Sequence, residues 1–176
     1  MSRIFSKVLF WCQAKNRHGV HSPFIYDFLD RAVYTPGVQK GTSRQRLLRA
    51  SREHFNPERI WIAPNLPENS KIRMNPEVDS KLQGPPFDLL VFDRPSHEVG
   101  EILSDPGQWH NDSVVYLGNL RGSASAYAMW EQISLHPSIR VVVESYWEGL
   151  LFFRKVQAKQ HFKIRTSTPI FEGLGK

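Results

Sequence analysis

The chain has a single cysteine, Cys12, among its 176 residues. One thiol cannot close an intramolecular disulfide, so the fold has to be stabilised by a packed core rather than by cross-links. This scarcity is typical of a reducing compartment, and we expect a cytoplasmic protein. Because Cys12 lies in an apolar stretch, we expect its side chain to be a small buried hydrophobe.

Long apolar runs are also absent. No stretch approaches the roughly 20 consecutive apolar residues that a membrane-spanning helix needs. The apolar patch at 8–12 follows Lys7 and precedes Lys15 and Arg17, and no small-residue cleavage site comes after it. The sequence therefore predicts neither a transmembrane segment nor a signal peptide.

Glycine is missing between Gly41 and Gly84. Loops that cradle a phosphate or a cofactor use glycine where the backbone must approach the ligand closely. The sequence also has no phosphate-binding loop motif and no serine-protease-like motif. His18 and His21 are too few ligands for zinc, so we expect no metal site.

Acidic residues are scarce in the first third of the chain. Residues 1–59 hold 11 Lys and Arg against 4 Asp and Glu, a formal charge of +7, and the other 117 residues carry −1. Such a segment could meet nucleic acid, lipid headgroups or an acidic protein. The arginines at 44, 46, 49 and 52 would supply salt-sensitive contacts to phosphates, unless they form an ordinary solvated helix face.

Apolar residues recur with helical spacing in the first part of the chain. Three helices are expected, over about 3–16, 22–33 and 44–55. Ser22 is a good N-cap and Pro23 suits the first helical position, while Thr42 or Ser43 could cap the third helix. We expect residues 1–56 to form a basic helical N-terminal extension.

After residue 57 the pattern changes to short apolar runs. Strands are expected at 60–63, 89–92, 113–117, 139–144 and 149–153, with helices at 98–103 and 123–135, a short strand at 72–74 and an edge strand near 161–165. Apolar strands that alternate with helices indicate a mainly parallel sheet covered on both faces. The short link between the last two long strands predicts an antiparallel hairpin. We therefore expect residues 57–176 to form a three-layer α/β sandwich with a reduced sheet, in one compact unit with the extension.

Two specific runs connect the chain to a known family. The first is Arg-His-Gly-Val-His-Ser-Pro-Phe at 17–24, and the second is Gly-Leu-Leu-Phe-Phe-Arg-Lys at 149–155. With these runs the sequence resembles a bacterial family of class I S-adenosylmethionine-dependent methyltransferases, common in Bacteroidetes. The resemblance covers residues 3–35 and 87–165 well and 44–70 loosely.

The resemblance implies a seven-strand Rossmann-like sheet that binds S-adenosylmethionine beyond its first strand. On this pattern the cofactor would meet Ala63, Asn65 and Asp93. The loop at 64–70 departs from the pattern, because it has no glycine and two prolines that cannot donate an amide proton. Only about 25 residues separate Ala63 from the strand at 89–92, so at least one βα unit is missing at average element lengths. We expect S-adenosylmethionine binding to be altered, weak or lost.

Two further signals concern anions. His18 and His21 lie three residues apart beside Arg17, and the three could clamp an anion or a substrate or supply a general base. The alternative is a structural turn before the second helix. A looser signal is the glycine pair at 118–122 ahead of Ser123, where the start of a helix could accept an anion.

Three functions are open on the sequence, and none of them fixes catalytic residues. The chain could be a methyltransferase-like protein with altered cofactor binding. It could be a non-catalytic binding or scaffold module that pairs with a second copy or with an intact methyltransferase. It could also bind RNA or another anionic surface through its basic N-terminal third.

Overall fold

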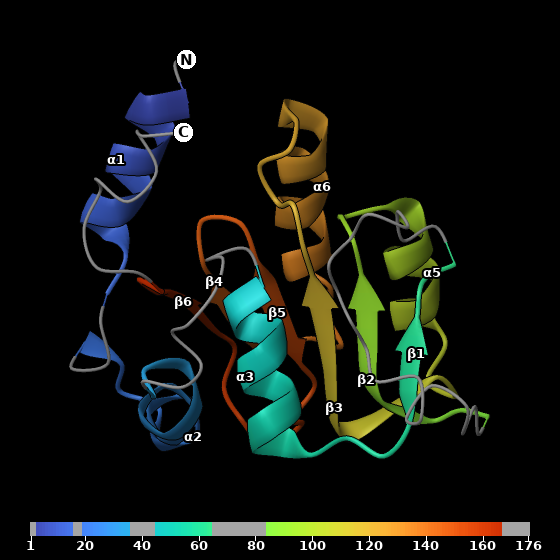
Figure 1. Ribbon diagram of the computed structural model, residues 1–176. Coiled ribbons are helices and arrows are strands. Elements are labelled where there is room, and N and C mark those ends of the chain that lie inside the picture. Colours follow the sequence, from blue (N-terminus) through green and yellow to red (C-terminus); the bar gives the residue numbers. More distant parts are fainter. Residues whose placement is uncertain (1–2, 16–18, 36–44, 65–83, 167–176) are drawn as a thin grey trace.

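The computed structural model describes residues 3–15, 19–35, 45–64 and 84–166. They form an α/β fold around one six-stranded sheet (Figure 1). Its strands are β1 (Ile60–Ile62), β2 (Phe87–Phe92), β3 (Trp109–Leu117), β4 (Val141–Glu144), β5 (Gly149–Phe152) and β6 (Gln160–Lys163). The helices are α1 (Arg3–Gln13), α2 (Pro23–Phe28), the π-helical turn η2 (Leu29–Val33), α3 (Arg46–Phe55), α5 (His97–Ser104) and α6 (Ala124–Ser134).

The sheet is mainly parallel, and its strand order is β1-β2-β3-β5-β4-β6. β1, β2 and β3 pair in parallel, as do β4 and β6. β5 is antiparallel to both of its neighbours, so the β4–β5 hairpin folds back and places β5 between β3 and β4. The expected mainly parallel α/β sheet, the hairpin and the edge strand after it are confirmed.

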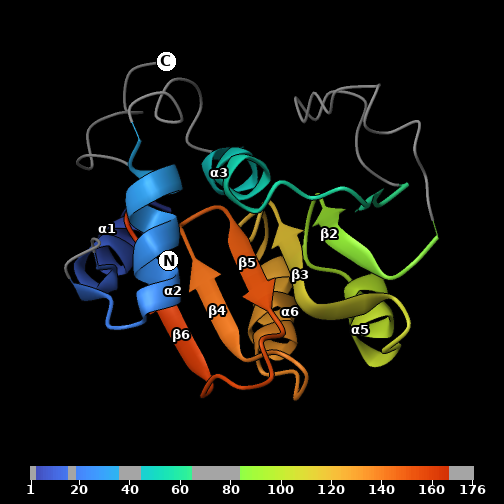
Figure 2. The same ribbon diagram turned by 90° about the horizontal axis from the view of Figure 1, so that it is seen from below.

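Helices cover both faces of this sheet (Figure 2). α2, η2 and α3 lie over one face, where Phe28 and Leu47 share a hydrophobic cluster with Val91 and Phe152 of the strands. α5 and α6 lie over the other face, in a second cluster that contains the fully buried Trp130. The central strands contain apolar runs, at 89–92, 114–117, 141–143 and 150–152, because both of their faces are buried there. The described helices of the N-terminal part and the strands thus share one core.

α2 begins where its sequence predicts. Ser22 has an extended backbone, its hydroxyl accepts a hydrogen bond from the amide of Ile25 at 3.4 Å, and Pro23 occupies the first helical position. α6 begins in the same way, because the Ser123 hydroxyl accepts from the amide of Ala126 at 3.0 Å. The N-cap predicted at Ser22 is confirmed.

α3 is capped from a distance. Its N-cap residue, Gln45, makes no side-chain cap, and Thr42 and Ser43 lie outside the described residues, as does the expected strand at 72–74. The carboxylate of Glu148, in the β4–β5 turn, accepts from the amide of Leu47 at 3.2 Å and from the amide of Leu48. Glu148 also accepts from the Tyr116 hydroxyl at 3.1 Å and is fully buried. A buried carboxylate therefore satisfies the helix start that no local residue caps.

This docking corrects the expectation that the arginines of α3 form a solvated face. Arg46 is 7% exposed, and Arg49 and Arg52 are half-buried, because the start of α3 is held against the hairpin. Arg44 lies outside the described residues. Arg46 is therefore not presented to the phosphates of a nucleic acid.

α1 lies beside the β6 edge of the sheet (Figure 2). Phe10 and Ala14 are buried there, whereas Ile4, Phe5 and Leu9 are exposed. Cys12 is exposed as well, so the expectation of a buried thiol is wrong. Its neighbours in sequence are apolar, but only one side of the helix meets the rest of the protein. Among the described residues, no helix is long and apolar enough to cross a membrane.

Gly149, at the start of β5, packs tightly against the core. A Cβ atom on Gly149 would lie 2.3 Å from the indole ring of the fully buried Trp130. We expect Gly149→Ala to lower the free energy of unfolding by about 1–3 kcal/mol, because the core cannot accommodate the added methyl group without shifting. Gly100→Ala in α5 is the matched control. It has open space around it, and alanine should raise stability there by about 0.5–1 kcal/mol. Urea denaturation checks both, and equal stability of the two variants would contradict this account.

The Glu148 cap should make stability depend on pH. Burial raises the pKa of Glu148 from 4.5 to about 7, although the Leu47 amide and the Tyr116 hydroxyl oppose the rise. The folded state therefore binds this proton more tightly than the unfolded chain. The resulting stability is complete below pH 4.5 and is lost as the pH rises through 7. At about 1.4 kcal/mol per pH unit, the loss is at most about 3 kcal/mol.

The variant Glu148→Gln separates the pH dependence that Glu148 causes from that of other titrating groups. His54 and His136 have pKa values lowered by burial, so their contributions to stability change with pH in the opposite direction. The difference in unfolding free energy between wild type and Glu148→Gln cancels both histidines. We expect this difference to shift in favour of the variant as the pH rises from about 5 to about 7. A difference that does not change with pH would mean that Glu148 is not buried as described.

Candidate functional site

The carboxyl ends of the parallel strands meet at one edge of the sheet, where open α/β folds bind ligands. Ala63 follows β1, Asp93 follows β2, Gly118 follows β3 and Ser145 follows β4. The structure thus brings two of the expected cofactor residues, Ala63 and Asp93, to neighbouring strand ends. Asn65 lies outside the described residues.

The Asp93 end of this edge is filled by the protein itself. The Asn119 amide donates to Oδ1 of Asp93 at 2.9 Å, and Arg94 donates to Oδ2 at 3.2 Å. Gly118 packs so closely that a Cβ atom would lie 2.8 Å from the Asp93 carbonyl oxygen. The Ala63 amide already donates to Val91 at 2.9 Å. The Asp93 carboxylate and the Ala63 amide are therefore engaged in hydrogen bonds within the chain.

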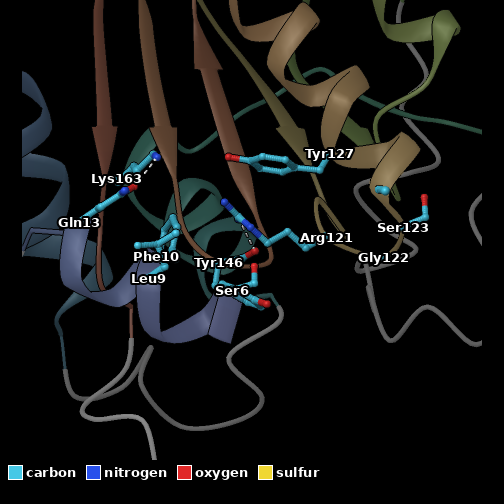
Figure 3. A pocket seen from close by; sticks show the side chains of 11 residues that line it. Ser6, Leu9, Phe10, Gln13, Arg121, Gly122, Ser123, Tyr127, Tyr146 and Lys163 are labelled. Carbon is cyan, nitrogen blue, oxygen red and sulfur yellow. Dashed lines mark hydrogen bonds between the residues drawn. The ribbon is translucent and has the colours of Figure 1, made fainter. Parts of the chain in front are cut away.

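A pocket of about 710 Å³ lies farther along the same edge, between α1 and the start of α6 (Figure 3). Its floor comes from the turn after β3, and its walls come from α1, the β4–β5 hairpin and β6. The lining residues are Ser6, Leu9, Phe10, Gln13, Arg121, Gly122, Ser123, Ala124, Tyr127, Tyr146 and Lys163.

Arg121 is the central side chain of this pocket. Its guanidinium carbon lies 4.2 Å from the ring centre of Tyr127, 4.7 Å from that of Phe10 and 4.9 Å from that of Tyr146. Figure 3 shows it between Tyr127 and Tyr146. It also donates to the carbonyl of Tyr146 at 2.8 Å and to a carboxylate oxygen of Glu144 at 2.6 Å. Three aromatic rings and one ion pair fix the orientation of the guanidinium.

Glu144 anchors this arrangement from beneath. It is fully buried at the end of β4, bonded to Arg121 through Oε1 and to Nε2 of His161 through Oε2 at 2.9 Å. Burial alone would raise the pKa of Glu144, but the His161 hydrogen bond and the Arg121 charge outweigh it and hold the pKa below its usual value. Burial and the charge on Glu144 raise the pKa of Tyr127, so its phenol stays protonated. Glu144 is therefore an anion that balances the charge of Arg121.

The remaining positive charge of the pocket is on Lys163. Its ammonium donates to the Gln13 side chain at 2.9 Å, and no carboxylate among the described residues lies within ion-pair distance. The first turn of α6 adds backbone amides, because such groups have no acceptor within their own helix. None of the described lining residues is acidic. The pocket therefore suits a ligand that combines an anionic group with a flat ring.

Part of this site was predictable from the sequence. The glycine pair ahead of Ser123 does place Gly122 and Ser123 in the pocket wall. Of the three expected anion-binding residues, His21 lies in a different cavity, and Arg17 and His18 lie outside the described residues. Sequence reasoning missed Arg121 and Glu144. The available signal was a carboxylate directly after the buried run at 139–143, since such a charge requires a partner.

Comparisons of the chain with protein-family models, with curated proteins and with solved structures find no match. The residues of the pocket and their geometry therefore indicate the function.

The buried ion pair between Arg121 and Glu144 can be tested by its effect on stability. We expect Arg121→Met to lower the free energy of unfolding by about 3 kcal/mol, because it leaves the Glu144 charge buried without its guanidinium, with His161 and the Tyr127 hydroxyl as its remaining contacts. Adding Glu144→Gln should restore part of the loss, since no buried charge is then uncompensated.

The control removes an exposed ion pair. Asp112→Asn breaks the pair with Arg154, whose side chains are 67% and 30% exposed, and should cost less than about 1 kcal/mol. Chemical denaturation of wild type and the three variants checks the series. The account fails if Arg121→Met costs no more than Asp112→Asn, or if the double variant is the least stable of the set.

Proposed function

We propose that this protein is a class I methyltransferase-like protein that binds S-adenosylmethionine weakly and acts as a binding module for a small anionic ligand with a flat ring. The ligand occupies the pocket between α1 and α6. The observation that carries this proposal is Arg121, fixed among three aromatic rings in a cavity whose described lining has no acidic residue.

The scaffold part of the proposal rests on topology and on sequence. A mainly parallel sheet covered on both faces is compatible with a Rossmann-like fold. The antiparallel β4–β5 hairpin is the feature that favours the methyltransferase type of this fold, and β5 carries part of the family-like run at 149–155. The opening run at 17–24 supports the same relationship.

The charge of the pocket argues against S-adenosylmethionine as its preferred occupant. The sulfonium group gives that molecule an additional positive charge, and it would face Lys163, whose charge no described carboxylate of the pocket balances. S-adenosylhomocysteine has the same adenosine ring and the same carboxylate without the sulfonium charge. Adenosine monophosphate carries the ring and a dianion. If charge decides binding, the affinities should rise from S-adenosylmethionine through S-adenosylhomocysteine to adenosine monophosphate.

Calorimetric titration of the purified protein with these three probes tests the proposal. We expect adenosine monophosphate to bind at least tenfold more tightly than S-adenosylmethionine. The proposal is wrong if S-adenosylmethionine binds most tightly, or if none of the probes binds at millimolar concentration to folded protein. Tightest binding of S-adenosylmethionine would instead support the hypothesis that the protein is a methyltransferase.

A variant at the start of α6 locates the binding site. Ala124 lines the pocket and is exposed in the first turn, where a glutamate is favourable for the helix. We expect Ala124→Glu to weaken adenosine monophosphate binding at least tenfold, because its carboxylate repels the phosphate. Ala124→Gln has the same size without the charge and should weaken binding much less. Equal affinities for the two variants would place the ligand elsewhere.

A further inference from the structure

We propose that a second cavity, along the outer edge of β6, binds a phosphate monoester or inorganic phosphate. The site goes beyond the function proposed above and does not depend on it. It is built by Lys15 and His21 from the segment before α2, and by His161 and Lys163 from β6. We reach it from the cavity lining, the direction of the backbone amides and the balance of charge.

The cavity has a volume of about 370 Å³. Its described lining is Gln13, Lys15, Gly19, Val20, His21, His161, Phe162 and Lys163, and it contains no acidic residue. Lys15 and His21 are exposed side chains, so a ligand in solution can reach them. The structure thus places His21, expected from the sequence to contact an anion, beside two lysines and a second histidine.

Backbone amides of β6 face the same cavity. Gln160 donates its amide to Arg140 of the segment before β4, and Ile164 donates to Glu144, so the even-numbered residues of β6 bond toward β4. In a parallel ladder, the residues between them face the opposite edge. The carbonyl of Lys163 confirms this direction, because it accepts from the amide of Lys15 at 2.8 Å. The amides of His161 and Lys163 therefore point toward the segment that carries Lys15 and His21.

Positive charge at this edge is not balanced locally. No carboxylate among the described residues forms an ion pair with Lys15 or Lys163, and the one buried acid nearby, Glu144, is already paired with Arg121 and His161. Gly19 lets the chain pass close to the Lys15 stem, since a Cβ atom there would lie 2.8 Å from it. Two outward amides and two ammonium groups match the oxygens and the charge of a phosphate dianion.

The first experiment is a titration of the full chain with inorganic phosphate, followed by calorimetry and by amide chemical shifts. Sodium chloride at the same ionic strength serves as the reference, so that general screening is subtracted. We expect saturable binding, with the largest shifts at the amides of His161 and Lys163. Shifts that do not saturate, or that chloride reproduces, would overturn the proposal.

Variants then assign the site. The double variant Lys15→Met with His21→Gln keeps both stems and removes the groups that only this cavity uses, and it should weaken phosphate binding at least tenfold. Lys155→Met removes one exposed charge elsewhere and should change the affinity less than twofold. Equal affinities for the two proteins would contradict the site.

Ala124→Glu separates the two pockets, because Ala124 lines only the first of them. It should leave phosphate binding unchanged. Loss of phosphate binding in that variant would place the anion in the first pocket and overturn this inference without affecting the proposed function.

Two phosphate sources are distinguished with glycerol phosphate in solution and with vesicles that contain phosphatidic acid. Vesicle retention that the double variant loses would assign a lipid headgroup. If glycerol phosphate displaces inorganic phosphate and the vesicles do not retain the protein, the natural ligand is a soluble phosphate ester.

Discussion

The β4–β5 hairpin carries two buried carboxylates, and each of them binds groups on a different side of the sheet. Glu144 faces the α6 side, where it holds Arg121 and His161. Glu148, four residues later, faces the opposite side and accepts the amides that begin α3. The antiparallel position of β5 between β3 and β4 brings this hairpin into the middle of the sheet rather than to its edge. A buried charge is costly unless it is paired, so each carboxylate fixes its partners in place.

The same hairpin gives its two carboxylates opposite ionisation behaviour. His161 and Arg121 lower the pKa of Glu144 in spite of burial. Glu148 accepts from the Leu47 and Leu48 amides and from the Tyr116 hydroxyl, but burial outweighs these contacts, so its pKa rises to about 7. One side of the hairpin is therefore a permanent anion that orients the pocket arginine. The other is a cap whose charge changes near neutral pH, and it acts on α3 rather than on the pocket.

Local patterns predicted the elements, whereas the site depends on contacts between distant residues. The apolar runs at 60–63 and 89–92, and the caps Ser22 and Ser123, are visible in a few neighbouring residues, and the structure confirms them. The burial of Arg46 depends on a carboxylate about 100 residues away, which no local pattern contains. The exposure of Cys12 depends on which side of α1 meets the sheet.

The carboxyl edge of a parallel sheet can form a binding site beyond any of its strand ends. Strand ends converge there whatever residues follow them, and the helix starts beyond them supply amides. In this chain the Asp93 end of that edge is closed by Asn119 and Arg94, and the open cavity lies beyond β3 and β4 instead. Lys163 and Gln13 line both this cavity and the one along β6. An anion that drew the Lys163 ammonium toward one cavity would withdraw it from the other, so occupation of the two cavities should be linked through this one side chain.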